Sequence, residues 1–213
     1  MLHHYSEDSA TLQLCCAPLQ VDSHTDFRQD WDVGLVQFLR RVPSYPRAVL
    51  SNYPRPGSPS DRSWPPLGAG ETESPQGALC GGDMEPLPDS KVYTFRLKDR
   101  SHQRRAGMGS IPRPGCFVAA GFLFGPAAML DAVRFDPYLP YIFHGEELSL
   151  SMRLWTSGFE IYSPPVDLVA HDYGRKSGSP KFWETVSGAR TREMLTCSPS
   201  RRISAFKPRT RRR

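Results

Sequence analysis

Short apolar runs of strand length alternate along this chain with segments of helical periodicity, and this alternation limits the fold more than any other feature. We expect strands at residues 19–22, 48–50, 92–97, 117–124, 160–163 and 166–171. We expect helices at residues 31–42, 126–133 and 145–157. Helices placed between strands are typical of mixed α/β folds, so the sequence predicts an α/β protein.

Individual residues predict the start of the first of these helices, and the apolar face and the end of the last. Asp30 is positioned to cap the first helix. In the last helix, Leu148, Met152 and Trp155 recur at i, i+4 and i+7, which is typical of one apolar face. Gly158 follows as a stop signal.

Residues 54–90 form a low-complexity segment with eight prolines and many glycines and serines. Such a composition buries too little apolar surface to order itself independently. A structureless loop of this length is uncommon inside a compact domain. We therefore expect a long Pro/Gly-rich loop, either a functional flap or an insertion.

The formal net charge of +5 comes from the C-terminus, because residues 201–213 carry seven Lys or Arg and no acid. Without them, 20 basic residues face 22 acidic ones. A basic tail can touch nucleic acid or anionic lipid. Since no basic surface interleaved with aromatics accompanies it, a nucleic-acid partner is the weakest interpretation, and we expect residues 196–213 to be a solvated, disordered tail.

The cysteines and the hydropathy pattern favour a cytoplasmic protein. The five cysteines form no C-x-x-C pair, which argues against a zinc ribbon and favours reduced thiols. No apolar run approaches the roughly 18 residues of a membrane span. The N-terminus shows no secretory signal pattern.

Asp22-Ser23-His24 is the first candidate for chemistry. At the end of an extended strand, residues 22 and 24 would project to one face, where carboxylate and imidazole suit a borderline divalent cation such as manganese. The alternative is a strand-end turn in which Asp22 caps a backbone N–H. His171, at the end of another expected strand, is a third ligand only if the fold brings it to the other two; a lone histidine there is usually structural.

Gly145-Glu146-Glu147 is the second candidate, at the start of the last helix. The helix dipole favours two carboxylates at this position regardless of function. In a functional interpretation, Gly145 allows close approach of a ligand and one glutamate accepts hydrogen bonds from sugar hydroxyls. The sequence has no G-x-S-x-G elbow, P-loop or G-x-G-x-x-G to support a serine hydrolase or a mononucleotide or dinucleotide fold.

These motifs stand in an order that resembles a known family. The chain is similar, over roughly residues 19–195, to the N-acetylglucosaminyltransferases that glycosylate hydroxyproline on a cytoplasmic ubiquitin-ligase adaptor, distant relatives of the polypeptide N-acetylgalactosaminyltransferases. The segments that carry the resemblance are 19–27 with Trp31-Asp32, 48–54, 121–126, 135–140, 145–147 with 153–158 and 162–164, and 171–176 with 182–184.

The resemblance implies a GT-A-like fold, a UDP-sugar donor, a divalent metal (Mn²⁺ or Mg²⁺), a protein hydroxyl acceptor and retention at the anomeric carbon. Carried over by position, the metal ligands are Asp22, His24 and His171. Glu146 contacts the donor sugar with Glu147 beside it, and Arg175 contacts the diphosphate.

The resemblance also departs from the family pattern, which places a nucleotide-binding segment before the D-x-H motif. Residues 1–18 do not match that segment, so we expect 19–195 to be the C-terminal part of a glycosyltransferase domain, with 54–90 inserted. Two functions follow from this. One is metal-dependent transfer of N-acetylglucosamine or a similar hexosamine; the alternative is a truncated, non-catalytic remnant that binds an acceptor protein without turnover.

Overall fold

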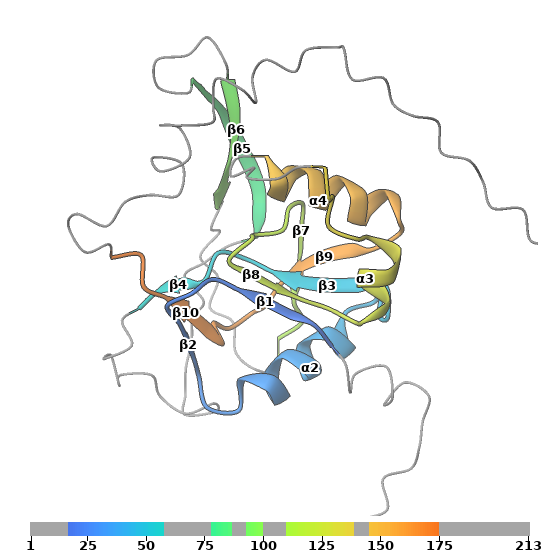
Figure 1. The fold of residues 1–213 in the computed structure, drawn as a ribbon. Helices are drawn as coiled ribbons and strands as arrows, with labels where there is room; N and C mark the ends of the chain where they lie inside the picture. Colours follow the sequence, from blue (N-terminus) through green and yellow to red (C-terminus); the bar gives the residue numbers. More distant parts are fainter. Residues whose placement is uncertain (1–16, 58–77, 87–92, 100–109, 139–144, 175–213) are drawn as a thin grey trace, which may run out of the picture. The chain divides into compact units, whose positions relative to one another are not determined.

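The structure, a computed structural model, describes residues 17–57, 78–86, 93–99, 110–138 and 145–174 (Figure 1). The chain divides into residues 1–174 and 175–213, and every described residue lies in the first of these units. The expected basic tail at 196–213 and the candidate Arg175 therefore lie outside the described residues.

A five-stranded mixed sheet forms the centre of the described part, and it confirms the α/β prediction. Its strands, in spatial order, are β1 (Leu19–Val21), β8 (Phe122–Phe124), β3 (Ala48–Ser51), β9 (Glu160–Ser163) and β7 (Arg113–Gly115). β3 and β9 pair in parallel, whereas the other neighbours are antiparallel. The apolar β3 is buried along its whole length, as expected of a central strand with both faces covered.

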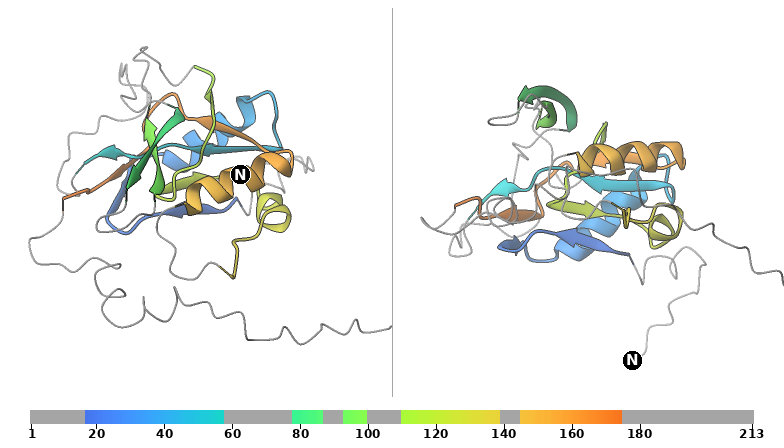
Figure 2. Two further views of the ribbon diagram at one scale, coloured as in Figure 1. Left: turned by 90° about the horizontal axis from the view of Figure 1, so that it is seen from above. Right: turned by 45° about the horizontal axis from the view of Figure 1, so that its top comes forward.

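Helices cover the two faces of this sheet (Figures 1 and 2). On one face, α2 (Trp31–Arg41) packs Leu35 and Phe38 into a cluster with Leu50 of β3. On the other face, α4 (Glu146–Thr156) and the short α3 (Ala128–Ala132) pack with the adjacent Val49. Neighbouring residues of one strand thus face different helices, which is the period-two alternation of a strand.

Two smaller sheets complete the described fold. In the first, β10 (Val169–His171) lies between β2 (Thr25–Phe27), to which it is antiparallel, and β4 (Arg55–Pro56), to which it is parallel. The second is the hairpin pair of β5 (Leu79–Pro86) and β6 (Tyr93–Asp99).

The expectation of a structureless segment over residues 54–90 is wrong where the structure describes it. Residues 55–56 belong to β4 and residues 79–86 to β5. Leu79 is buried, and β5 gains its backbone hydrogen bonds from the alternating strand β6, so a partner supplies what the local composition lacks. Residues 58–77 lie outside the described part.

The last helix was predicted correctly, but its buried face was not. In α4 the buried residues are Ser151 and Leu154, whereas Met152 and Trp155 are 60% and 56% exposed. The predicted apolar spacing therefore does not mark the side that packs on the sheet. Gly158, with φ of 79°, ends the turn after the helix as expected.

Three smaller expectations also differ from the structure. Asp30 precedes α2 but makes no side-chain cap hydrogen bond, because it adopts a left-handed conformation. Within the expected strand 117–124, only β8 and an isolated bridge between Ala119 and Phe122 are extended pairings. β7, at residues 113–115, was not predicted. Among the described residues, no helix is long and apolar enough to cross a membrane.

Candidate functional site

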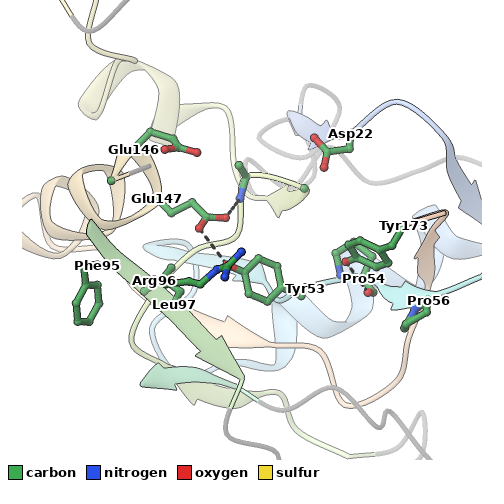
Figure 3. Close-up of a pocket in the computed structure, with 13 residues that line it drawn as sticks. Asp22, Tyr53, Pro54, Pro56, Phe95, Arg96, Leu97, Glu146, Glu147 and Tyr173 are labelled. Carbon is green, nitrogen blue, oxygen red and sulfur yellow. Dashed lines mark hydrogen bonds between the residues drawn. The ribbon is translucent and has the colours of Figure 1, made fainter. Parts of the chain in front are cut away.

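A cavity of about 580 Å³ opens between the central sheet, the start of α4 and the β5–β6 hairpin (Figure 3). We call its two sides the sheet wall (Tyr53, Ala120, Gly121 and Glu147) and the hairpin wall (Phe95, Arg96 and Leu97). The other lining residues are Asp22, Pro54, Pro56, Gly145, Glu146 and Tyr173. Residues that are far apart in the sequence therefore meet around one cavity.

Glu147 fixes the sheet wall through both of its carboxylate oxygens. Oε1 accepts a hydrogen bond from the Ala120 N–H at 2.8 Å, and Oε2 accepts one from the Tyr53 hydroxyl at 3.0 Å (Figure 3). Burial raises the pKa of Glu147 above its usual range, although these two donors oppose the shift. Since both oxygens already have partners, Glu147 is suited to hold the wall in place.

The backbone just before Ala120 is held by two buried serines. The Val118 N–H donates to Oγ of Ser151 at 2.9 Å, and the Ala119 N–H donates to Oγ of Ser51 at 2.7 Å. The Ser51 hydroxyl itself donates to the Phe122 carbonyl at 2.6 Å. Buried amides without such partners would each cost free energy, so the serines make this loop conformation possible.

Glu146 lines the same cavity without such partners. Its Oε2 atom is buried and has no hydrogen-bond partner among the described residues. Burial, with a smaller contribution from Glu147, raises the pKa of Glu146 from its ordinary value of 4.5 to about 7. Gly145, with φ of 99°, precedes it and also lines the cavity. Of the two glutamates, Glu146 is therefore the one whose carboxyl group is available to a ligand.

The Asp22-Ser23-His24 motif forms a turn, not the extended segment that would place residues 22 and 24 on one face. β1 ends at Val21 and β2 begins at Thr25. His24 has φ of 64°, and the hydroxyl of Thr25 donates to the Asp22 carbonyl at 2.6 Å. The alternation argument for this motif was wrong because the chain bends between β1 and β2, so residues 22–24 are not extended.

The structure nevertheless brings Asp22 and His171 together. Nε2 of His171 lies 3.8 Å from Oδ2 of Asp22, which is too long for a hydrogen bond. The antiparallel pairing of β2 with β10 sets this position, with His171 opposite Thr25, and the Asp172 N–H donates to the His24 carbonyl at 3.0 Å. The first and last strands of the described chain thus deliver these two side chains to one place.

This pair fits a divalent cation in its donor chemistry. A carboxylate oxygen and an imidazole nitrogen suit manganese-type ions. Nδ1 of His171 is buried with no hydrogen-bond partner in the described part of the chain. Within those same residues, however, no three His, Cys, Asp or Glu side chains gather as a ready metal site, so the side chain of His24 does not complete the predicted triad.

Three cavity residues, Tyr53, Arg96 and Tyr173, and the supporting Ser51 were not assigned a role from the sequence. Tyr53 and Ser51 follow or end a strand, and their contacts to Glu147 and Phe122 depend on the fold. Tyr173 donates to the Pro54 carbonyl at 2.9 Å and packs edge-on against His171, with ring centroids 4.5 Å apart. Arg96 lies in β6, whose pairing with β5 was not expected from the sequence. Ser51, Tyr53 and Tyr173 stand in segments that carry the family resemblance, but the sequence assigned none of them a role.

A comparison with known families assigns this chain. A protein-family model described as Glycosyltransferase (GlcNAc) matches residues 17–212, a range that contains every residue lining the cavity. No curated protein matches the chain significantly. On the strength of this match along nearly its whole length, the chain belongs to the GlcNAc glycosyltransferase family.

Proposed function

We propose that this chain transfers N-acetylglucosamine, or a similar hexosamine, from a UDP-sugar to a hydroxyl group of a protein, and that the cavity holds the donor. Family membership supports glycosyl transfer in general. The observation that carries the finer proposal is the meeting of Asp22 and His171, at 3.8 Å, beside a cavity that Glu146 lines. We infer a GT-A-type arrangement, in which an acidic residue after a strand of the central sheet faces the donor.

The charges around the cavity support a need for a cation. Asp22, Glu146 and Glu147 are acidic, whereas Arg96 is the single basic side chain among the described lining residues. A diphosphate carries negative charge and would be repelled by Asp22 and by the ionised fraction of the two glutamates, whose pKa values are raised. Asp22 and His171 would hold a divalent cation, and His24 would add a third ligand if its side chain turned toward them. When bound, such a cation neutralises the diphosphate and stabilises UDP as a leaving group.

Glu146 is the residue that we assign to the sugar. Its buried Oε2 lacks a partner among the described residues, so hydroxyl or amide groups of the sugar would satisfy it. Glu147 acts through the wall by holding Ala120 and Tyr53 in place. In the reaction, the acceptor oxygen bonds to the anomeric carbon and gives up its proton to the leaving diphosphate oxygen, while the bond from that carbon to the diphosphate breaks and UDP leaves with the electron pair.

The experiment is UDP release by the purified full chain with UDP-N-acetylglucosamine and manganese, beside the variants Asp22→Ala and His171→Ala. We expect each variant to lower the rate at least tenfold and to weaken manganese binding measured by titration. Asp131→Ala, on the exposed side of α3, is the matched control and should leave both unchanged. Equal rates in all four proteins would contradict the proposed site. Acceptor binding without affinity for UDP would favour the non-catalytic alternative.

A further inference from the structure

Two cysteines outside the cavity lie at the place where the β5–β6 hairpin joins the rest of the fold. Cys80 is the second residue of β5, and Cys116 directly follows β7. Both are free thiols. Neither takes part in the proposed transfer reaction.

Backbone hydrogen bonds hold these two segments side by side. The N–H groups of Cys116 and Phe117 both donate to the carbonyl of Leu79, at 2.9 and 3.0 Å. Leu79 is buried, so this junction is anchored in the core. Cys80 directly follows Leu79 in the chain, so this shared carbonyl places the backbones of Cys80 and Cys116 next to each other.

We propose that Cys80 and Cys116 are a modification site that an oxidant converts to an intramolecular disulfide, which fastens the hairpin wall of the cavity to the edge of the central sheet. Two thiols and one peroxide molecule give one disulfide and two waters, so the sulfurs are oxidised and the peroxide is reduced. A disulfide needs Cα atoms within about 7 Å and a sulfur–sulfur bond of about 2 Å, and the backbone bonds to Leu79 hold the two segments close enough for side-chain rotation to bring the sulfurs together.

The consequence lies in what the hairpin carries. Phe95, Arg96 and Leu97 of β6 form the hairpin wall, and β6 pairs along its length with β5. The ring of Phe95 also faces that of Phe117, with centroids 6.0 Å apart, next to Cys116. A covalent link at the base of β5 would therefore restrict the hairpin wall without touching any residue that lines the cavity.

The accessibility of the pair suits a reversible modification. Cys80 is exposed and Cys116 is half-buried. Exposed disulfides are the ones that reductants reach and that serve regulatory roles. Although the residue is exposed, partial burial of its thiol, together with the neighbouring Cys116, raises the pKa of Cys80 to about 11, so we expect oxidation to be slow at neutral pH and to need a peroxide at mildly alkaline pH.

The test uses the full chain with Cys15→Ser, Cys16→Ser and Cys197→Ser, which leaves Cys80 and Cys116 as the only cysteines. After treatment with hydrogen peroxide, mass spectrometry should show the loss of two hydrogens and a peptide in which Cys80 is linked to Cys116. The same oxidation in urea should be about tenfold slower or more, because only the folded chain holds the thiols together. Equal rates in both conditions, or a linkage between two chains, would overturn the proposal.

A second measurement tests the fastening itself and does not require activity. Amide hydrogen exchange in β5 and β6 should slow after oxidation and recover after reduction. Cys116→Ser in the same background is the control, since Cys80 can then gain oxygen but cannot form the bridge. Unchanged exchange in an oxidised, linked chain would overturn the mechanical part of the proposal. Because neither readout involves a sugar donor, failure here is distinguishable from failure of the proposed transferase function.

Discussion

The polar contacts that support the sheet wall of the cavity are buried, whereas those that support the hairpin wall are exposed to water. In the sheet wall, Ser51, only 1% exposed, and the carboxylate of Glu147 bind successive backbone amides. In the hairpin, the ion pairs join Arg96 with Glu85 and Lys98 with Asp83, all on exposed surface. Buried polar contacts are costly to break, whereas exposed ion pairs contribute little.

This difference teaches which side of the cavity is fixed before a ligand arrives. The sheet wall has one geometry in which every buried amide of residues 118–120 has a partner. The hairpin is anchored chiefly through Leu79 and Leu97, and its tip lies in residues outside the described part. We therefore expect the sheet wall to set the position of the sugar and the hairpin wall to adjust to it.

The largest expected effect removes apolar packing beneath the sheet wall. Leu154 of α4 is fully buried, so Leu154→Ala should lower the free energy of unfolding by about 3 kcal/mol through lost burial and a residual cavity. Urea denaturation measures it. Met152→Ala, on the same helix but 60% exposed, should change it by less than about 0.5 kcal/mol. The reverse order would contradict the assignment of the buried face of α4.

The next effect separates buried polar contacts from packing. Ser51→Ala leaves the Ala119 amide and the Phe122 carbonyl without their buried partner, and we expect a loss of about 2 kcal/mol in unfolding free energy. Thr156→Ala removes an exposed hydroxyl that bonds only within its own helix, and should cost at most about 0.5 kcal/mol. Urea denaturation measures both variants. Similar losses in unfolding free energy would show that the buried hydrogen bonds of Ser51 contribute no more to stability than exposed ones.

The third prediction concerns pH and Glu146. Its folded pKa of about 7 lies above the ordinary 4.5, so the folded state holds this proton more tightly than the unfolded state. The resulting stabilisation is complete below about pH 4.5 and is lost as the pH rises through about 7. Glu146→Gln should therefore be more stable than the parent above pH 7, by on the order of 1 kcal/mol for this half-exposed group.

Denaturation of both proteins across this pH range tests the sign. The difference should shrink steadily as the pH falls and vanish near 4.5. A constant difference at every pH would mean that burial does not disfavour the carboxylate. A parent more stable than the variant above pH 7 would mean that Glu146 has a charged partner that offsets its burial.

The smallest expected change in stability lies in the hairpin wall. Arg96→Ala removes an exposed ion pair with Glu85 and should alter the free energy of unfolding by no more than about 0.5 kcal/mol. If Arg96 contacts the diphosphate as its place in the cavity suggests, UDP affinity measured by calorimetry should nonetheless fall about tenfold. Lys98→Ala, two residues along and outside the cavity lining, is the matched control and should retain affinity. Equal losses in the two variants would indicate a general charge effect.

The sequence predicted four of the five strands of the central sheet because their signals are local, and it did not predict β7. The apolar run at residues 48–50 predicts a strand, and Gly158 predicts the end of α4. Both signals can be recognised from neighbouring residues alone. The buried face of α4 could not be predicted in this way. Ser151 is buried because it accepts from the Val118 N–H and donates to the Glu147 carbonyl, and these contacts appear only after folding.

The sequence pointed to several residues that lie at the cavity, but it did not predict how they are arranged there. Asp22, Glu146 and Glu147 do line the cavity, and His171 does lie beside Asp22. At Asp22-Ser23-His24 the sequence left an extended segment and a strand-end turn both open, because a positive φ at His24 leaves little trace in a single sequence. β5 was not predicted because it lies in a Pro/Gly-rich segment that does not favour a strand, and it is ordered only by pairing with β6. Long-range pairing, not local preference, decided both.

The pairing of β2 with β10 has a consequence for how the protein becomes competent during its synthesis. Asp22 leaves the ribosome before its neighbour His171, and Tyr173 is the last of the described cavity-lining residues to be synthesised. A nascent chain that stops before β10 leaves β2 without its antiparallel neighbour and Asp22 without His171. Ligand capture should therefore begin only when translation has passed this strand.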